Sequence, residues 1–544
     1  MLLTLSINGL PFVFGWFFLF AALVLICTVA QSLRYVHMLQ LSGYHNNEYR
    51  HWCKEHLAQI YSPARLLCYL TLLLLALRSV LFSFVPPLYF LVIACVGLCC
   101  GLLDAMPRKA KKPLVFTKRV WRLLVTFAVL VAVIVLLWEH LVGFGSYWKM
   151  AVGASVLLVL TPMLVPLANV VNVPIEKAVT NWYIRDAKRI LAEHKDLTVI
   201  GITGSYGKTS TKNFLYSMLS TKYNTLMTPE SYNTTMGVVR TIRERLKSSH
   251  EVFIVEMGAT NVGDIKEICD IVHPQYGLLT SIGEQHLESF GTVENIVKTK
   301  FELYDAIPEN GFICVNADNE RICAELKARR GDGKAVVTYG VKDESTADYR
   351  ALDGTVSGAG CRFTLRDKSG VETAFGTKLL GGHNVQNITG CLALATELGI
   401  PADKLVYAVR LLKPVRHRLE LLPNGFIDDA FNSNPAGFRS ALETLKAFSG
   451  ERVLVTPGMV ELGEREAPLN EELGAYAADC CDLAILVGER QAPPLKKGLL
   501  SAGFDEGKIY VAASLADAMN YLKNVPANGT RTVLLENDLP DNYD

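Results

Sequence analysis

Long apolar runs are concentrated in the first third of the chain and become rare after it. A helix needs about 20 apolar residues to cross a bilayer. Five runs approach that length, and they lie near residues 12–30, 66–84, 87–103, 123–138 and 150–171. The hydropathy pattern therefore predicts an α-helical membrane domain, with about five transmembrane helices, over residues 1–171.

The loops between these runs differ in their content of lysine and arginine. The loop after the third run reads "MPRKAKKPLVFTKRVWR" and holds seven basic residues, and segment 31–65 holds four. The two remaining loops hold none. Because basic loops stay on the cytoplasmic side of a membrane, we expect the N-terminus outside and every residue after 171 in the cytoplasm.

Two of the apolar runs contain residues that are unusual in a membrane. Arg78 lies toward the outer end of the second run. There it either extends its charge to the interface or contacts a lipid or substrate head group. Pro162 and Pro166 lie inside the fifth run, which is typical of a kinked helix.

The pattern changes after the fifth run. Residues 172–196 combine basic residues with apolar residues at helical spacing, namely Ile175, Val179, Trp182, Ile184 and Ile190. This pattern predicts an amphipathic linker helix, which lies against the inner leaflet or packs on a soluble domain. From residue 197 onward the chain has the composition of a soluble protein, with short apolar runs that suit buried strands.

Composition narrows the possible functions. The chain has 544 residues, too many for one ordinary domain, and 50% of them are hydrophobic. Its net charge is +1, and its soluble part lacks a sustained basic stripe with interleaved aromatic residues, so no nucleic-acid partner is expected. The 13 cysteines include no CxxC pair, which favours reduced, structural cysteines in a cytosolic compartment.

A candidate phosphate-binding loop, "GSYGKTS", follows the short strand pattern "LTVIGIT". Gly204 and Gly207 allow a tight turn whose N–H groups can face a phosphate. Lys208 can neutralise the β- and γ-phosphates, Thr209 can place a hydroxyl on Mg²⁺, and the next helix directs its N-terminus at the anion. The strict pattern has glycine where this chain has Ile202, so the alternative is a glycine turn before an ordinary helix.

Three further residues have positions that suit the same chemistry. The apolar run 252–255 ends at Glu256. A carboxylate at the tip of a neighbouring strand is placed where Mg²⁺ needs an oxygen ligand, and the alternative is a solvated glutamate at a strand end. His286 follows another apolar run, and Lys300 begins a helical pattern. Taken alone, Lys300 is best interpreted as a surface lysine.

The succession of motifs resembles the Mur ligases of cell-wall synthesis, most closely their D-alanyl-D-alanine-adding branch. The resemblance covers roughly residues 198–464 and is weaker beyond them. It rests on "TGSYGKTS", "TPESYNTTMGV", "VEMGATNVGDI", "GEQHLESFGTVENIVKTKFEL", "VNADN", "GGHNVQNITGCLALATELGI", "RHRLE", "IDDAFNSNPAGFRSALETL" and "VTPGMVELGE". The family's own loop reads TGxxGKT, which accounts for the departure from the strict phosphate-loop pattern.

This resemblance implies both a fold and a reaction. A central ATP-binding domain over residues 197–415 would have a mostly parallel sheet with flanking helices, and a Rossmann-like α/β domain would cover residues 416–544. The implied enzyme is an ATP-dependent carbon–nitrogen ligase, which activates a carboxylate as an acyl phosphate and joins it to the amine of an amino acid or dipeptide. The implied cofactors are ATP, two Mg²⁺ ions and a carbamylated lysine at Lys300.

The resemblance also assigns roles residue by residue. Catalytic roles are implied for Lys208, Glu256, His286 and Lys300, and metal contacts for Thr209, Asn233, Glu256, His286 and Lys300. Nucleotide contacts are implied for Gly204, Ser205, Gly207, Lys208, Thr209, Ser210, Asn316, His383, Asn384, Asn387, Arg418, Asp429, Asn432 and Asn434. Arg418 would reach the nucleotide from the interdomain link, and the last three of these residues would contact it when the C-terminal domain closes.

The chain departs from the family pattern in several places. Segment 231–234 reads Ser-Tyr-Asn-Thr where the family often has more asparagines, and Gly458 stands where the family usually has aspartate. The apolar runs and the linker occupy the place of the family's N-terminal UDP-binding domain. A carboxylate acceptor that is lipid-linked, at the inner leaflet of a bacterial cytoplasmic membrane, therefore fits the sequence best, with membrane lipid as a further partner.

Three other functions stay open. A poly-amino-acid synthetase, such as a poly-γ-glutamate ligase, would add one amino acid repeatedly. An ATP-driven transporter would use the apolar helices as a path, but these carry few charges apart from Arg78, and no ABC-type signature follows the phosphate loop. A binding subunit without catalysis is disfavoured by the presence of Lys208, Glu256, His286 and Lys300.

Overall fold

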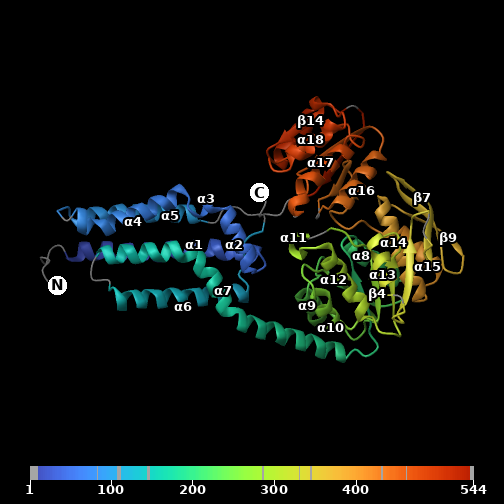
Figure 1. Cartoon of the computed structure of the whole chain (residues 1–544), viewed down its shortest axis with the longest axis horizontal. Coiled ribbons are helices and arrows are strands. Elements are labelled where there is room, and N and C mark those ends of the chain that lie inside the picture. The colour runs from blue at the N-terminus through green and yellow to red at the C-terminus, as the bar shows by residue number, and fades with distance from the viewer. Residues whose placement is uncertain are drawn as a thin grey trace. The chain divides into compact units, whose positions relative to one another are not determined.

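The three-dimensional structure is a computed structural model of the chain. It describes residues 10–82, 84–106, 112–143, 147–284, 287–329, 331–343, 346–430, 433–460, 462–527 and 529–538. These residues form two compact units, one up to Asn181 and the other from Trp182 onward. Figure 1 shows that the first unit consists of helices and that the second combines helices with two sheets.

The first unit is held together by apolar contacts between long helices. It contains α1 (Leu10–Leu41), α2 (Asn46–Glu55), α3 (Leu57–Ile60), α4 (Pro63–Leu81), α5 (Pro87–Ala105), α6 (Lys118–Leu141) and the first part of α7 (Tyr147–Ala192). One buried cluster joins α1, α4, α5 and α7, and includes Phe20, Leu72 and Leu98. A second cluster, with Tyr35 and Val120, joins α6 and α7 to the segment α1–α3.

Four helical segments of the described residues are long and apolar enough to cross a membrane. They are Phe18–Leu41, Leu88–Ala105, Lys118–Leu141 and Trp148–Ala192. The apolar run at 66–84 forms α4, which is helical but is not among these four. The total of five spans therefore stays a prediction.

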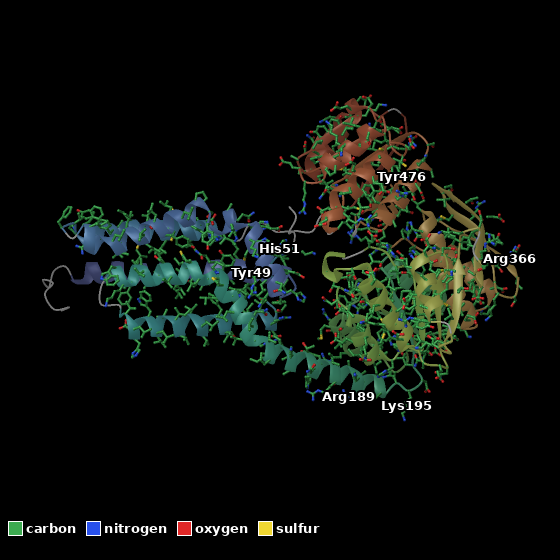
Figure 2. All side chains as sticks on the ribbon, in the orientation of Figure 1. Tyr49, His51, Arg189, Lys195, Arg366 and Tyr476 are labelled. Carbon is green, nitrogen blue, oxygen red and sulfur yellow. The ribbon has the colours of Figure 1, made fainter. Side chains whose placement is uncertain are left out.

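Helix α7 contains both the fifth apolar run and most of the expected linker segment. The two segments form one helix, Tyr147–Ala192, which contains Pro162, Pro166 and Pro174. Pro166 has no N–H, so the carbonyl of Pro162 lacks its usual helical donor. The hydroxyl of Tyr49, a residue labelled in Figure 2, donates to that carbonyl at 2.8 Å and so satisfies it.

Two arginines of α4 differ in their surroundings. Arg78 donates from Nε and Nη2 to the carbonyl of Val85 at 3.1 and 2.8 Å, so its guanidinium is directed to the end of its helix. Arg65 is one of the four basic residues of segment 31–65 that led us to expect this loop in the cytoplasm. In the structure it is fully buried. Its Nε lies 2.9 Å from Oδ2 of Asp104. The charge of Arg65 therefore serves an internal ion pair.

The last turns of α7 belong to the second unit. Ala187 is fully buried there, and Tyr183 and Ile184 pack against a buried cluster that includes Phe253. Asp186 accepts a hydrogen bond from Nε of Arg243 at 2.7 Å. Of the two expected roles for the amphipathic segment, the structure shows packing on the α/β unit.

The central domain is built on a nine-stranded sheet. Its strands are β1 (Thr198–Thr203), β2 (Thr225–Met227), β3 (Val252–Glu256), β4 (Tyr276–Leu279), β5 (Phe312–Asn316), β6 (Ala335–Gly340), β7 (Tyr349–Ser357), β8 (Gly360–Arg366) and β9 (Glu372–Thr377), in the order β2-β3-β1-β4-β5-β6-β7-β8-β9. The pairs from β2 to β7 are parallel, and β8 and β9 continue antiparallel. This confirms the expected mostly parallel sheet.

Helices cover both faces of this sheet, which explains why its strands are continuous apolar runs. The helices are α8 (Lys208–Leu219), α9 (Thr235–Arg245), α10 (Asp264–Val272), α11 (Leu287–Phe290), α12 (Val293–Ala306), α13 (Glu320–Ala328), α14 (Gly382–Glu397) and α15 (Ala402–Arg410). One buried cluster packs α8, α14 and α15 on the sheet, and another packs α9, α10 and α12. Because the strands are parallel, the loops after β1, β3, β4 and β5 meet at one edge.

The C-terminal domain has a second sheet with parallel core strands. Its strands are β10 (Glu420–Leu421), β11 (Phe426–Asp429), β12 (Glu451–Thr456), β13 (Leu483–Val487), β14 (Ile509–Ala512) and β15 (Arg531–Glu536), in the order β10-β11-β15-β12-β13-β14. Only β10 pairs antiparallel among these. The helices are α16 (Pro435–Lys446), α17 (Glu466–Ala477), α18 (Ala492–Ser501) and α19 (Leu515–Asn524). The expected Rossmann-like α/β fold is confirmed.

Candidate functional site

The loop between β1 and α8 has the tight turn that its glycines predict. Gly204 and Gly207 have φ of 146° and 80°, the region that favours glycine. A Cβ on Gly207 would lie 2.5 Å from Oδ1 of Asn387. Glycine at 207 is therefore required both by the backbone conformation and by the approach of α14.

The segment that follows β4 forms hydrogen bonds with this loop. The N–H of Ser205 donates to the carbonyl of Ser281 at 2.7 Å. The Ser205 hydroxyl donates to the carbonyl of Gly283 at 3.1 Å and accepts from its N–H at 3.0 Å. Ser210 lies buried in the first turn of α8. These bonds hold the loop in its tight turn.

Lys208 folds back over its own loop. Its Nζ donates to the carbonyls of Gly204 and Ser205 at 2.7 and 3.0 Å. Burial lowers the pKa of Lys208 to about 8, and the carboxylate of Glu256 opposes that shift. Removal from water leaves the ammonium poorly solvated, so an incoming phosphate oxygen would be a favourable partner for it.

Glu256, at the end of β3, is the centre of a buried polar cluster. Its Oε1 accepts from the Thr209 hydroxyl at 2.9 Å and from Nδ2 of Asn233 at 3.2 Å. Its Oε2 lies 2.9 Å from Nζ of Lys212. The structure thus brings together the predicted residues Thr209, Asn233 and Glu256, and adds Lys212.

The oxygen atoms at this position fit a magnesium ion better than a transition metal. Among the described residues, no three His, Cys, Asp or Glu side chains gather to form a metal site. Mg²⁺ is commonly held by one or two carboxylates together with substrate phosphates. The Glu256 carboxylate beside the Thr209 hydroxyl and the phosphate loop matches that donor set. His286, predicted as a further metal contact, lies outside the described residues.

Lys300 is not the surface lysine that its sequence pattern alone suggests. It lies on α12 and is 3% exposed, and its Nζ stands 5.9 Å from the centre of the Phe290 ring. Burial, and then the nearby charge of Lys208, lower the pKa of Lys300 well below its usual value. Burial of this kind favours the neutral, nucleophilic form of the amine.

The residues predicted on the adenosine side gather where α14 meets the end of β5. Asn316 donates from Nδ2 to the carbonyl of Thr280 at 2.9 Å and accepts from Nε2 of Gln386 at 3.1 Å. Asn384 donates to the carbonyl of Leu380 at 2.7 Å, and its buried Oδ1 has no hydrogen-bond partner. Asn387 instead lies against the phosphate loop, as the space around Gly207 shows.

His383 connects this region with the C-terminal domain. Its Nδ1 lies 2.7 Å from the hydroxyl of Ser440, on α16. Burial, and then the charge of Arg418, lower the pKa of His383 to about 4. The imidazole is therefore neutral at physiological pH, and in that form it hydrogen-bonds with Ser440.

Among the described residues of the C-terminal domain, Arg418 contacts the phosphate-binding segment. Nη2 of Arg418 lies 3.4 Å from the hydroxyl of Thr209. Asp429, at the end of β11, accepts from the N–H of Leu419 at 3.0 Å. Asn434 caps α16 by accepting from the N–H of Gly437 at 2.9 Å, so in this structure its side chain serves the fold. Asn432 lies outside the described residues.

Sequence reasoning missed two participants of the site. Lys212 stands four residues after Lys208 on α8, and that helical spacing is the signal that could have placed both on one face. Gln386 follows His383 in the same helix, but nothing in its pattern indicates that it would reach Asn316 on β5.

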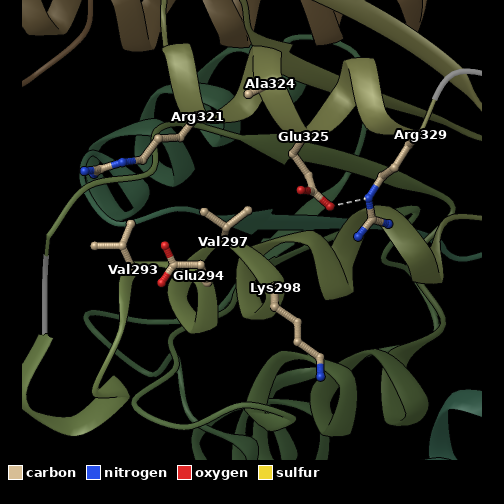
Figure 3. Close-up of a pocket in the computed structure, with 8 residues that line it drawn as sticks. All are labelled: Val293, Glu294, Val297, Lys298, Arg321, Ala324, Glu325 and Arg329. Atoms are coloured by element: carbon tan, nitrogen blue, oxygen red, sulfur yellow. Dashed lines mark hydrogen bonds and ion pairs between the residues drawn. The ribbon is translucent and has the colours of Figure 1, made fainter.

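A cavity of about 390 Å³ lies between α12 and α13, and the site residues described above do not line it. Figure 3 shows its lining, which mixes acidic, basic and apolar side chains: Val293, Glu294, Val297, Lys298, Arg321, Ala324, Glu325 and Arg329. Within it Arg329 donates to Glu325 at 2.8 Å. None of these residues is among the predicted site residues.

Two family models match the α/β part of the chain. Residues 202–395 match the Mur ligase middle domain, and residues 417–535 match the Mur ligase glutamate ligase domain. The UDP-N-acetylmuramoyl-tripeptide–D-alanyl-D-alanine ligase of Mycobacterium leprae is 30% identical over 350 residues, which are 58% of this chain and 67% of that protein. The ligase of the same name from Bacillus subtilis is 29% identical, and the match covers 51% of this chain and 59% of that protein.

Solved structures of MurF are also similar to this chain. MurF from Acinetobacter baumannii has 27% sequence identity and a TM-score of 0.60, over 66% of this chain and 77% of that one. MurF from Thermotoga maritima, solved in complex with ADP, has 26% identity and a TM-score of 0.56, over 66% and 80% of the two chains.

Proposed function

This chain belongs to the Mur ligase family, and on that premise we propose that it is an ATP-dependent ligase that joins a carboxylate to an amine. The observation that carries the proposal is the cluster at the end of β3. There the hydroxyl of Thr209 and the carboxylate of Glu256 lie 2.9 Å apart, beside the phosphate loop that holds Lys208. This arrangement provides a cation, a hydroxyl and a carboxylate at the place where a triphosphate would end.

In the proposed reaction the γ-phosphate passes from ATP to a substrate carboxylate, and the amine then displaces phosphate from the acyl phosphate. Both partners of the first step are anions, so positive charge must be fixed between them. Lys208 and the N-terminus of α8 supply that charge from this chain. When bound through Glu256 and Thr209, Mg²⁺ would neutralise further charge on the phosphate oxygens.

Lys300 is proposed to carry a carbamate. Carbamylation joins carbon dioxide to an unprotonated amine, and the lowered pKa of Lys300 supports that state. The modified side chain would present a carboxylate to a second magnesium ion, whereas an ammonium would repel it. Intact-mass measurement in bicarbonate buffer tests this: a gain equal to one carbon dioxide is expected, and it should be absent from Lys300→Arg.

The C-terminal domain is proposed to complete the site when nucleotide binds. The contact of Arg418 with Thr209 supports this role, because it brings a cation from the second domain to the phosphate loop. Burial has the largest effect and lowers the pKa of Arg418, whereas the charges of Glu256 and Asp429 act in the opposite direction. Closure of this kind excludes water, which would otherwise hydrolyse an acyl phosphate.

The substrates are proposed from the relatives and from the first unit. The relatives' name describes the joining of D-alanyl-D-alanine to a UDP-linked muramoyl tripeptide, so we propose a D-alanyl dipeptide or amino acid as the amine. The four apolar helical segments support attachment to a bacterial cytoplasmic membrane, with the ATP site in the cytoplasm. An acceptor carried on a lipid at that membrane would reach the ligase by lateral diffusion.

Product analysis tests the acceptor. The purified full chain is supplied with ATP, Mg²⁺, D-alanyl-D-alanine and either a soluble UDP-muramoyl tripeptide or the same glycopeptide on a polyprenyl carrier. Mass spectrometry is expected to find the extended peptide on the lipid-linked acceptor. Turnover of the soluble acceptor alone would contradict the lipid-linked substrate and leave a conventional ligase. Repeated addition of one amino acid would instead support a poly-amino-acid synthetase.

A further inference from the structure

Lys212 is a buried lysine that the proposed reaction does not yet use. It lies on α8 with a fully buried side chain. Its Nζ is 2.9 Å from Oε2 of Glu256 and also donates to the main-chain carbonyl of Glu230. A buried ammonium needs such partners because burial of an unpaired charge is costly.

The two partners of Lys212 belong to different segments of the chain. Glu256 ends strand β3, whereas Glu230 belongs to segment 228–234, which leads into α9. Glu230 has a positive φ of 44°, a strained conformation for a residue with a side chain. Glu230 keeps this conformation, and its main-chain carbonyl accepts the hydrogen bond from Lys212.

The same segment presents Asn233 to the other oxygen of Glu256. Nδ2 of Asn233 donates to Oε1 at 3.2 Å, and the carbonyl of Asn233 accepts from the N–H of Gly258 at 2.7 Å. The Thr228 hydroxyl accepts from the N–H of Glu256 at 3.1 Å. The N–H of Thr228 also donates to the carbonyl of Ile254 at 3.0 Å, so hydrogen bonds at both ends of segment 228–234 join it to β3 and to Gly258, and Lys212 contacts both Glu256 and Glu230.

We propose that Lys212 is a positioning residue for the magnesium-dependent step: it holds Oε2 of Glu256 and the backbone of segment 228–234, so that Oε1 stays beside the Thr209 hydroxyl. Its charge occupies one oxygen of the carboxylate and leaves the other for the cation. This inference rests on the proposed function, because it assigns a purpose to the geometry of that site. Lys212 itself touches neither nucleotide nor substrate in this role.

Nucleotide binding with and without Mg²⁺ tests the proposal. The dissociation constant of ADP is measured by calorimetry on the full chain and on Lys212→Met, which keeps the buried aliphatic length but removes the charge. We expect the apparent affinity for Mg²⁺ in the ternary complex to fall by about 10–100-fold, the usual loss when the partner of a metal ligand is removed. The affinity for ADP without Mg²⁺ should stay unchanged, because Lys208 is intact.

Hydrogen exchange provides a second readout that needs no nucleotide. Amides of segment 228–234 should exchange faster in Lys212→Met than in the wild type, while those of α15, in the same domain, should keep their rates. Lys222→Met removes an exposed lysine shortly after the same helix and is the matched control for both measurements. Lys212→Gln, which keeps a donor without a charge, is expected to give intermediate values and takes over the test if the methionine variant does not fold.

Two results would overturn the inference. One is a folded Lys212 variant with wild-type affinity for Mg²⁺, and the other is unchanged exchange in segment 228–234. A wild-type chain that binds ADP with no effect of Mg²⁺ would contradict the proposed function itself. In that case faster exchange in Lys212→Met would still support the positioning of segment 228–234, so the two failures are distinguishable.

Discussion

Asp429 and Glu536 lie side by side at the ends of the parallel strands β11 and β15, as partners in register. Burial raises the pKa of Asp429 to about 6, and burial together with the charge of Asp429 raises the pKa of Glu536 well above its usual value. Glu536 accepts from the Ser433 hydroxyl at 2.7 Å through Oε1. The C-terminal domain thus contains a carboxyl pair that holds protons more tightly when folded than when unfolded.

This pair predicts a pH dependence of stability. As pH rises from about 4 through about 6, the folded state must release a proton that the unfolded chain has already lost, so the free energy of unfolding falls. Glu536→Gln removes one of the two ionisations. We expect the variant to gain roughly 1–3 kcal/mol relative to the wild type between these pH values and neutrality, measured by chemical denaturation.

Glu489→Gln is the control for that experiment, because Glu489 is an exposed residue of the same domain. Its free energy of unfolding should follow the wild type at every pH. Equal pH dependence of Glu536→Gln and the wild type would mean that the pair does not control the stability of this domain.

The turn at Gly207 predicts a strong effect of a single methyl group. Gly207→Ala places a Cβ at positive φ and 2.5 Å from Asn387 Oδ1. The strain is of order 1–3 kcal/mol, so we expect the affinity for ATP, measured by calorimetry, to fall by about 10–100-fold. Gly370→Ala has nearly the same φ, 83°, but open space around its Cβ. An equal loss in both variants would mean that the turn has no specific role.

We expect the loss of the Lys208 side chain to reduce turnover more than it reduces the stability of the fold. Lys208→Met removes the cation that lies over the phosphate loop, and loss of one such group costs about 10²–10³ in kcat/KM for ATP. The midpoint of thermal unfolding should remain close to that of the wild type, because the hydrogen bonds of Lys208 to described residues go to its own loop. A variant with normal kcat/KM would exclude this loop as the γ-phosphate site.

In the first unit, the buried pair of Arg65 and Asp104 should control stability. Asp104→Asn leaves Arg65, which is fully buried, without its opposite charge. Breaking a buried pair in this way costs about 3–5 kcal/mol. Thermal unfolding in detergent should show the loss, whereas Glu55→Gln, at the exposed pair with His51, should show none. A stable Asp104→Asn variant would contradict an internal role for Arg65.

The parts of the structure that the sequence predicted well are those with local causes. The strand, glycine turn and helix around Lys208 follow one another within a few residues, so the local sequence pattern predicts them without knowledge of tertiary contacts. Glu256 was placed correctly because parallel strands bring their ends to one edge. The resemblance to the Mur ligases likewise implied a mostly parallel sheet with flanking helices, which the structure confirms.

The parts that escaped prediction depend on residues far apart in the chain. The hydrogen bond that satisfies the Pro162 carbonyl in α7 comes from Tyr49, 113 residues away. The buried state of Arg65 depends on Asp104, and the role of Lys212 depends on Glu256 and on the conformation of Glu230. No periodicity indicates such pairs, because each partner taken alone fits an ordinary surface or loop position.

The most direct test of a ligase that works through an acyl phosphate is the transfer of oxygen from the acceptor to phosphate. The full chain is supplied with ATP, Mg²⁺, D-alanyl-D-alanine and a muramoyl-peptide acceptor, soluble or lipid-linked, whose carboxylates carry oxygen-18. If the account is right, each amide formed releases one inorganic phosphate that contains one oxygen-18 atom. Amide formation with unlabelled phosphate, or ATP hydrolysis that neither acceptor nor amine affects, would contradict it.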